Sequence, residues 1–280
     1  MRIVSYRYQD RESFGFVTGS SVVPADSVAG VAARTVIELI EEGLPTRDRL
    51  SAASTRVPLD QIEYQLPVQA TKILCAGVNF PTHRTETGRD AAKPPTPTIF
   101  TRYLDSFVPH LAPIFKPAIS DQFDYECELA IVVGRHAWQV PVETAIDHVF
   151  GYSCLNDGSV RDWQAHTAQW TPGKNWYRSG SIGPWIVTAD EFGVPGTQRI
   201  QTRVNRSVRQ SALLEEMIHS VAELIAYCST FTPLRPGDII AGGTTGGVGK
   251  FMEPTGYLHD GDVVEVEIDG IGTLTNRVAS

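Results

Sequence analysis

The chain has 280 residues, of which 42% are hydrophobic and 20% charged, a composition typical of globular proteins. Its formal net charge of −8 argues against nucleic acid or an anionic membrane as the main partner. No apolar run approaches the roughly 18 residues of a membrane span, and the first ten residues lack the apolar stretch of a secretion signal. We therefore expect a cytoplasmic protein without membrane contact. The four cysteines show no CxxC spacing, which favours reduced thiols.

Residues 1–65 form a distinct first section. Residues 1–8 and 13–25 alternate like short antiparallel strands, and residues 33–43 read as one helix that stops at Gly43 and Pro45. The section contains no histidine and no acidic cluster placed for chemistry. We interpret it as a small α/β domain with a structural role.

Residues 66–280 are strand-rich, and their few helices are short. Strands are predicted at 71–80, 95–103, 123–134 and 183–190, and a hairpin at 264–278 turns at Asp269-Gly270. Helices are predicted at about 213–229 and over 142–150. The pattern indicates a β-rich α+β fold, with a small N-terminal domain at 1–65 and a larger domain at 66–280.

The strand predicted at 123–134 carries two acids on one face. Alternation places Glu126 and Glu128 together, roughly 6–7 Å apart, with Cys127 and Leu129 on the opposite, apolar face. Like charges at this spacing repel and are costly to desolvate. Three interpretations stay open: a hard divalent cation offsets the cost, the pair is exposed and inert, or the acids serve a glycosidase. The last is disfavoured because glycosidase carboxylates flank the sugar bond from opposing sides.

Other motifs are ambiguous when taken singly. His83 and Glu86 are three residues apart, so one helical turn would bring them into contact as a water-activating base or as a plain surface pair. Asp157 follows an apolar segment, where an aspartate is usually a turn former. Residues 242–250 are not a phosphate loop, because Thr244 stands where its first glycine is required. They predict a tight turn that approaches either a ligand or another strand.

Several motifs in order resemble the fumarylacetoacetate hydrolase family over about residues 70–280. They are "GVNFPTHRTETG" at 77–88, "FDYECELAIVVG" at 123–134, "GYSCLNDGSVRDWQ" at 151–164, "GK" at 173–174 followed by "IGPWIVT", "GGTTGGVG" at 242–249, and "GDVVEVEIDGIGTLTN" at 261–276. The resemblance implies a roll of mixed β-sheets with a small variable N-terminal domain, assembled as a homodimer.

The resemblance also implies roles for individual residues. Glu126, Glu128 and Asp157 match the carboxylates that hold Mg²⁺, with Mn²⁺ or Ca²⁺ as alternatives. His83 and Glu86 match a dyad that activates water, and Lys174 matches a lysine that stabilises developing negative charge. Gln164 matches an oxyanion-stabilising amide, and Thr244 a threonine that contacts a bound 2-oxo carboxylate.

The activity implied is metal-dependent hydrolysis of a C–C bond in acylpyruvate-type 2,4-dioxo acids. The alternative on the same scaffold is an isomerase or decarboxylase of 2-hydroxymuconate-like dioates from aromatic catabolism, in which no water attacks. A hypothesis from another class is a non-catalytic, ligand-binding homodimer. The presence of both His83 and Glu86 favours hydrolysis.

Two segments depart from the family pattern. Gly242 and Thr245 replace a threonine and a proline, and this change is expected to loosen the loop that touches the substrate carboxylate. After Lys174, residues 175–181 differ from the usual pattern. Trp176, Tyr177 and Arg178 either reshape the pocket or are neutral changes.

Overall fold

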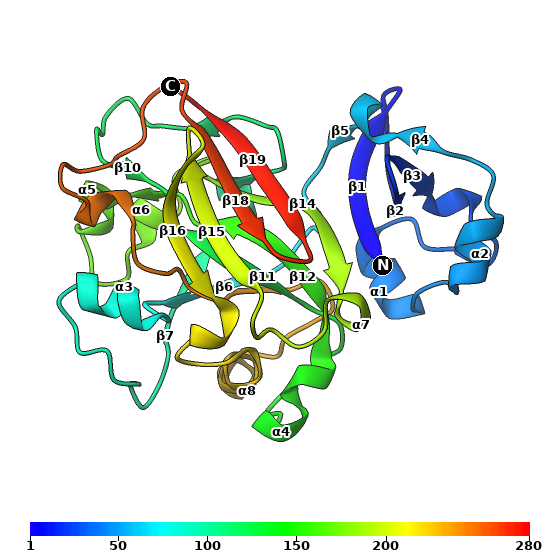
Figure 1. The fold of residues 1–280 in the computed structure, drawn as a ribbon. Helices are drawn as coiled ribbons and strands as arrows, with labels where there is room; N and C mark the ends of the chain where they lie inside the picture. The colour runs from blue at the N-terminus through cyan, green and yellow to red at the C-terminus, as the bar shows by residue number, and fades with distance from the viewer.

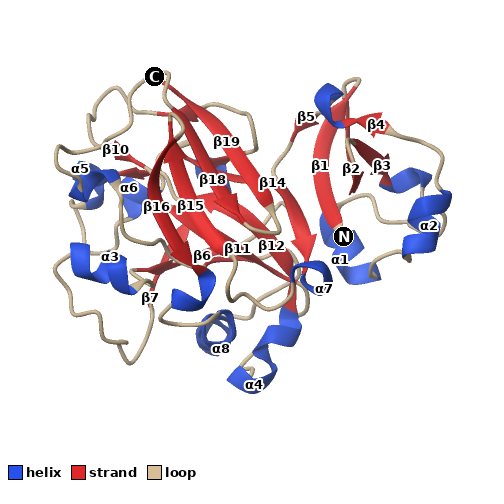
Figure 2. Ribbon diagram, viewed as in Figure 1, coloured by secondary structure: helices blue, strands red, loops and turns tan.

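Strands dominate the structure, as the alternating apolar patterns predict (Figures 1 and 2). The computed structural model describes residues 1–280. A 12-stranded mixed sheet runs through it. Its strands are, in spatial order, β4 (Val57–Pro58), β3 (Ser21–Pro24), β2 (Arg11–Thr18), β1 (Arg2–Tyr8), β14 (Gly180–Thr188), β12 (Val149–Asn156), β11 (Cys127–Val133), β17 (Ile239–Ala241), β6 (Ile73–Gly77) and β7 (Thr98–Arg102), while β5 (Glu63–Tyr64) pairs with β1 and β8 (Phe107–Val108) with β14.

A second, five-stranded sheet packs against the first. Its strands are β16 (Ser207–Leu213), β15 (Arg199–Val204), β18 (Val263–Ile268), β19 (Gly272–Ala279) and β9 (Ile114–Phe115). β18 and β19 form the predicted hairpin, and Gly270 takes the positive φ of 86° that its turn requires. A short ladder joins β10 (Phe123–Asp124) to β13 (Ser159–Val160). The fold is the predicted β-rich α+β roll.

The helices are short, and none is long and apolar enough to span a membrane. The α-helices are α1 (Val36–Glu42), α2 (Arg47–Ala52), α3 (Pro81–Glu86), α4 (Val142–Ala145), α5 (Arg161–Gln164), α6 (Thr171–Lys174), α7 (Ala189–Phe192) and α8 (Val221–Phe231). Single 3₁₀ turns are η1 (Ala25–Ser27), η2 (Leu59–Gln61), η3 (Leu104–Ser106), η4 (Ile146–His148), η5 (Leu214–Glu216) and η6 (Gly249–Phe251).

Two helix predictions need correction. The segment 213–229 is not one helix: η5 ends at Glu216, and α8 starts only at Val221. Ser220 caps α8 by accepting the N–H of Glu223, whose carboxylate in turn accepts the N–H of Ser220, so this capping box fixes a new start. In 142–150, α4 passes into η4, and β12 already begins at Val149.

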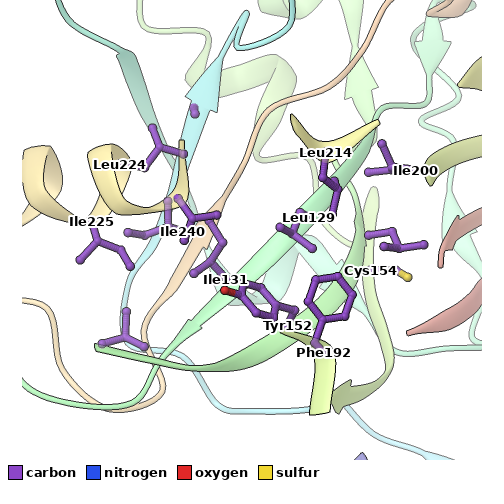
Figure 3. Close-up of a cluster of buried hydrophobic side chains, with 14 of the residues drawn as sticks. Leu129, Ile131, Tyr152, Cys154, Phe192, Ile200, Leu214, Leu224, Ile225 and Ile240 are labelled. Carbon is purple, nitrogen blue, oxygen red and sulfur yellow. The ribbon is translucent and has the colours of Figure 1, made fainter. Parts of the chain in front are cut away.

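The main core fills the space between the two sheets and α8 (Figure 3). Side chains of β11 and β12 pack on one side of this core, those of α8 on a second side, and those of the five-stranded sheet on a third. The labelled members in Figure 3 are Leu129, Ile131, Tyr152, Cys154, Phe192, Ile200, Leu214, Leu224, Ile225 and Ile240. The predicted apolar face of residues 127–133 therefore packs where alternation places it, and all four cysteines are buried free thiols.

The N-terminal elements form a lobe that continues the large sheet (Figure 1). β1 pairs antiparallel with β14, with Ile3 opposite Ile186. A second core joins the lobe to the opposite face of β11, where Phe16 and Leu39 belong to the same cluster as Ala130. In Figure 1 the lobe lies on the right, whereas α3, α5 and α6 lie at the left edge of the larger body. The domain boundary at 65 stays a prediction.

Candidate active site

Three buried carboxylates meet where β11 begins and β12 ends. Glu128 is the second residue of β11, Glu126 lies just before that strand, and Asp157 directly follows β12. The strands pair antiparallel with Cys127 opposite Asn156, so the start of one lies beside the end of the other. Oxygens of the three carboxylates lie within 4.8 Å of one another. The fold therefore gathers the three acids that the sequence motifs indicated.

The strand predicted at 123–134 is interrupted beside this cluster. β10 ends at Asp124 and β11 begins at Cys127, so the chain leaves the ladder for two residues. Side chains replace the missing partners: the Glu126 N–H donates to Asn156 Oδ1 (3.1 Å) and the Cys127 N–H to Gln210 Oε1 (3.0 Å). The prediction of one continuous strand was wrong here, because distant amides satisfy the backbone.

Three cations hold two of the acids in place. Lys174 Nζ donates to Glu126 Oε2 (2.7 Å) and to Asp157 Oδ2 (2.6 Å). Arg161 Nη1 donates to Glu126 Oε1 at 2.6 Å, and Arg102 Nη1 donates to Asp157 Oδ1 at 2.5 Å. All five side chains are more than nine-tenths buried, where charge-assisted hydrogen bonds are strong and water does not screen them.

Glu128 is the member of the cluster that makes no ion pair. Its Oε2 accepts the backbone N–H of Gly243 at 2.9 Å. Nearby Asp124 is buried too and pairs with Arg161 Nε at 2.8 Å. The buried site therefore holds four carboxylates (124, 126, 128, 157) against three cations (102, 161, 174), which leaves one negative charge uncompensated.

The pKa values of the two glutamates shift in opposite directions. Burial alone would raise the pKa of Glu126, but the charges of Lys174 and Arg161 outweigh it and hold that pKa well below its usual range. Burial, followed by the charges of Asp157 and Glu126, raises the pKa of Glu128 well above its usual range. The same environment that stabilises one carboxylate thus penalises the charge of the next.

A divalent cation fits this donor set. Hard ions such as Mg²⁺ and Mn²⁺ prefer oxygen ligands, and all three residues offer carboxylates. Each oxygen of Glu126 and Asp157 accepts one charge-assisted bond, and a carboxylate oxygen has a second lone pair to offer. An added positive charge would also offset the uncompensated negative charge at Glu128. The residues present therefore suit the metal that the family resemblance implied.

His83 lies on α3, as the three-residue spacing to Glu86 predicts. His83 Nδ1 and Glu86 Oε1 are 2.6 Å apart, and Glu86 Oε2 accepts the N–H of Gly247 at 2.8 Å. The carboxylate is thus held from both sides and fixes the imidazole ring. His83 is 6% exposed and lines the same cavity as Glu126. Its Nε2 is the ring nitrogen left for a substrate or a water molecule.

The glycine-rich loop at 242–250 packs against other backbone. A Cβ at Gly247, whose φ is 102°, would lie 2.1 Å from the carbonyl oxygen of Arg209. A Cβ at Gly243 would lie 2.6 Å from Asn79 Cβ. Of the two readings of this turn, close approach to another part of the chain is the one found. Thr244 still reaches the cavity, and its Oγ1 accepts a hydrogen bond from Gln210 at 2.8 Å.

The predicted site residues converge on one cavity of about 170 Å³. His83, Glu126, Glu128, Gln164, Lys174 and Thr244 line it. Glu86 and Asp157 stand behind this lining, bonded to His83 and Lys174 respectively. Gln164 Oε1 accepts a hydrogen bond from Arg161 Nη1 at 3.0 Å. All eight side chains therefore belong to one constellation, although their individual roles stay predictions.

Sequence reasoning missed three charged residues of the site. Asp124 and Arg161 lie inside the quoted motifs, and Arg102 lies at the end of β7 in a segment read only as a strand. A signal for the two arginines was present, because several buried acids require buried cations to offset their charge.

The departures from the family pattern have little effect on the cavity. Trp176, Tyr177 and Arg178 do not line it, and Tyr177 is 59% exposed. The expectation that Thr245 loosens its loop was wrong. Thr245 is buried, its Oγ1 lies 3.1 Å from Thr82 Oγ1, and its carbonyl accepts a 2.7 Å hydrogen bond from Gln210. A hydroxyl here fastens the loop to α3.

Comparison with known proteins agrees with the resemblance seen in the sequence motifs. Residues 72–279 match the family model described as fumarylacetoacetate (FAA) hydrolase C-terminal. The oxaloacetate tautomerase FAHD2A, mitochondrial, of Bos taurus is 33% identical over 267 residues, which cover 93% of this chain and 84% of that one.

Two solved structures share the fold. That of 2-hydroxyhepta-2,4-diene-1,7-dioate isomerase from Mycobacterium marinum has a TM-score of 0.81 and 31% identity, covering 100% of this chain and 98% of that one. Fumarylpyruvate hydrolase from Pseudomonas aeruginosa, in complex with Mn²⁺ and pyruvate, has a TM-score of 0.69 and 32% identity, covering 78% and 91%. The chain therefore belongs to the fumarylacetoacetate hydrolase family.

Proposed function

We propose that this protein catalyses the keto–enol tautomerisation of a 2-oxo dicarboxylic acid of the oxaloacetate type. The observation that carries the proposal is His83, oriented by Glu86, in the same cavity as Glu126 and Glu128. The bovine relative named oxaloacetate tautomerase supports this choice of reaction, because the match spans most of both chains. Tautomerisation, which needs no water, thus ranks ahead of the hydrolysis that the motifs favoured.

The proposed reaction moves a proton between C3 of the substrate and its 2-oxo oxygen. His83 Nε2 takes the C3 proton, the electron pair of that C–H bond forms the C2=C3 double bond, and the carbonyl pair moves to oxygen, which then takes a proton from the imidazolium of His83. Glu86 accepts the Nδ1–H and stabilises the imidazolium that forms. Lys174 lines the cavity and provides positive charge for the oxygen as it becomes negative.

Other residues of the cavity bind and orient in this proposal. Glu126, Glu128 and Asp157 would hold Mg²⁺, with Mn²⁺ or Ca²⁺ as alternatives, and a bound ion supplies Lewis-acid polarisation of the 2-oxo acid. Gln164 and Thr244 donate to the oxygens at the 2-oxo end. The family resemblance further supports a homodimer, for which light scattering is expected to give twice the 30.7 kDa chain mass.

A deuterium-exchange assay tests the proposal. Proton NMR monitors how fast the C3 protons of oxaloacetate are replaced by deuterium when Mg²⁺ is present. His83→Asn is expected to lower the enzymatic rate by about 10²- to 10⁴-fold, because the base is lost. His136→Asn, an exposed histidine away from the cavity, serves as the matched control. Calorimetry should show Mg²⁺ binding in both variants. Exchange at the wild-type rate in His83→Asn rules this residue out as the base, and no exchange by the wild type refutes the proposed reaction.

Hydrolysis of an acylpyruvate is the second candidate, supported by the relative whose structure contains Mn²⁺ and pyruvate. Here His83 would deprotonate water, the hydroxide would attack the acyl carbonyl carbon, and the C–C bond pair would leave as an enolate that takes a proton. Release of pyruvate from acetylpyruvate or fumarylpyruvate, measured beside the exchange assay, decides between the two reactions.

Two further outcomes are informative when the same protein is assayed with other 2-oxo acids and with a 2-hydroxymuconate-like dioate. Double-bond migration in a 2-hydroxymuconate-like dioate would favour the isomerase reading, which the Mycobacterium marinum relative supports. Binding of 2-oxo acids without turnover of any would favour the ligand-binding homodimer.

A further inference from the structure

Two cations in the cavity have no acidic partner. Arg89 and Lys250 line the same cavity as Glu126 and Glu128, yet neither side chain forms an ion pair or a hydrogen bond. The deeper cations differ, because Lys174 is 2% exposed and bridges two carboxylates, whereas Arg89 and Lys250 are exposed. In a chain with a net charge of −8, two cations that line one cavity and have no acidic partner indicate a place for an anion.

The backbone of Lys250 is anchored to the acidic cluster. Its N–H donates to Asp124 Oδ2 at 3.0 Å, and the N–H of Gly249 donates to Asp124 Oδ1 at 2.8 Å. The same carboxylate accepts from Arg161 Nε, so one buried aspartate positions both an inner and an outer cation of the cavity. Lys250 Nζ lies 5.5 Å from the ring centroid of Phe251, which also lines the cavity.

Arg89 is carried by a segment that is fastened to α3. Its N–H donates to the carbonyl of Arg84 in α3 at 2.9 Å. α3 is tied to that loop by two further bonds, from the Gly246 N–H to Thr82 Oγ1 (3.0 Å) and from the Gly247 N–H to Glu86. Both cations thus have a backbone fixed by hydrogen bonds and an exposed side chain, as suits capture of a charged group arriving from water.

We propose that Arg89 and Lys250 bind the second carboxylate of the substrate and make the enzyme selective for 2-oxo dicarboxylic acids over 2-oxo monocarboxylic acids. The inference rests on the proposed function, which places the 2-oxo carboxylate end at the buried cluster. A four-carbon substrate then directs its far end toward the exposed part of the cavity. There a carboxylate gains two charge-assisted partners, whereas a methyl group gains none.

A binding measurement tests this independently of turnover. Malate and 2-hydroxybutanoate are stable analogues of oxaloacetate and 2-oxobutanoate, and they differ only in a carboxylate replacing the terminal methyl. Calorimetry on the Mg²⁺-loaded wild type should show malate binding about tenfold more tightly or better. Arg89→Met and Lys250→Met should each weaken malate binding about fivefold while 2-hydroxybutanoate binding stays within twofold. Lys250→Arg should restore the preference.

The controls separate this inference from the proposed reaction. Arg235→Met removes an exposed, unpaired arginine outside the cavity and matches the change in net charge, so it should leave both affinities unchanged. In the exchange assay, the cavity variants should raise KM for oxaloacetate and leave kcat within twofold. Equal affinity of the wild type for both analogues, or equal losses for both in the variants, overturns the inference. A wild type that prefers malate but exchanges no oxaloacetate overturns the reaction and keeps the selectivity.

Discussion

At the residue scale, the acids of the cluster are not equivalent, and their environments predict opposite effects of neutralisation. Asp157 accepts from Arg102 and Lys174, whereas Glu128 accepts only from a backbone N–H. Glu128→Gln should stabilise the metal-free protein by about 1–2 kcal/mol, because it removes a buried, repelled charge and keeps an acceptor for Gly243.

Asp157→Asn is the matched contrast. It should destabilise the metal-free protein by about 3 kcal/mol, because buried Arg102 loses its only carboxylate partner and Lys174 keeps only Glu126. Urea unfolding in the presence of a chelator measures both changes, and both variants should weaken Mg²⁺ binding. If Glu128→Gln is as destabilising as Asp157→Asn, the charge count of four acids against three cations is wrong.

A half-buried histidine outside the site makes stability depend on pH. His110 Nδ1 accepts the N–H of Thr275 at 3.0 Å, its ring packs on Tyr64, and burial lowers its pKa to about 4. Because the folded-state pKa is depressed, the stability contribution of His110 is complete above the unfolded pKa near 6.5. It is lost as the pH falls toward 4, since the unfolded chain binds the proton first.

The expected loss is about 2 kcal/mol between pH 7 and pH 5 from this residue alone. Urea unfolding of the wild type and of His110→Asn at both pH values measures it. The variant should be less stable at pH 7, where it loses contact with Tyr64, but should show the smaller drop. Equal drops in the two proteins would show that other groups titrate.

At the element scale, α3 and the glycine-rich loop act as one unit that positions His83. Gly247→Ala places a Cβ against the carbonyl of Arg209 and shifts the N–H that holds Glu86. Gly261→Ala is the matched control, since Gly261 also has positive φ (84°) but open space around its Cβ position.

Both substitutions should cost about 1 kcal/mol for the left-handed backbone, and Gly247→Ala should cost several kcal/mol more and reduce exchange activity. Thermal unfolding and the deuterium-exchange assay measure the two effects. Equal stability and full activity in both variants would mean that the loop does not hold the dyad.

Element types were largely predictable from periodicity, and element ends were not. The strand faces around Leu129 and the turn at Asp269-Gly270 follow local rules. The break at Tyr125 and Glu126 depends on amides of Asn156 and Gln210, which are distant in sequence. No local pattern encodes such partners.

The same limit applies to the site. The motifs identified eight of its side chains, because the family motifs keep these residue types at fixed spacing. Arg102 was missed, since its role appears only when β7 is folded beside Asp157. The opposite pKa shifts of Glu126 and Glu128 are likewise a product of which cations the fold brings near each acid.

At the scale of the whole molecule, the N-terminal lobe and the larger body share one sheet and one core. Ile3 faces Ile186 across the β1–β14 ladder, and Phe16 and Leu39 cluster with Ala130 of β11. Deleting residues 1–65 would expose the edge of β14 and that apolar face, so we expect residues 66–280 alone to aggregate. Soluble yield and thermal unfolding measure this, and a truncated chain with the melting temperature and activity of the full chain would show that the lobe is an independent domain.

Lys174 bridges Glu126 and Asp157, so these two acids have a counter-charge even without a metal ion. Because Lys174, Arg161 and Arg102 already balance three of the four buried acids, the chain can complete its fold on internal charges alone. Uptake of the proposed divalent ion would then follow folding, unlike that of a zinc finger, which is unfolded without its ion. If the proposed reaction requires that ion, the chain would persist during metal shortage as a folded but inactive protein and regain activity when a suitable divalent ion is supplied.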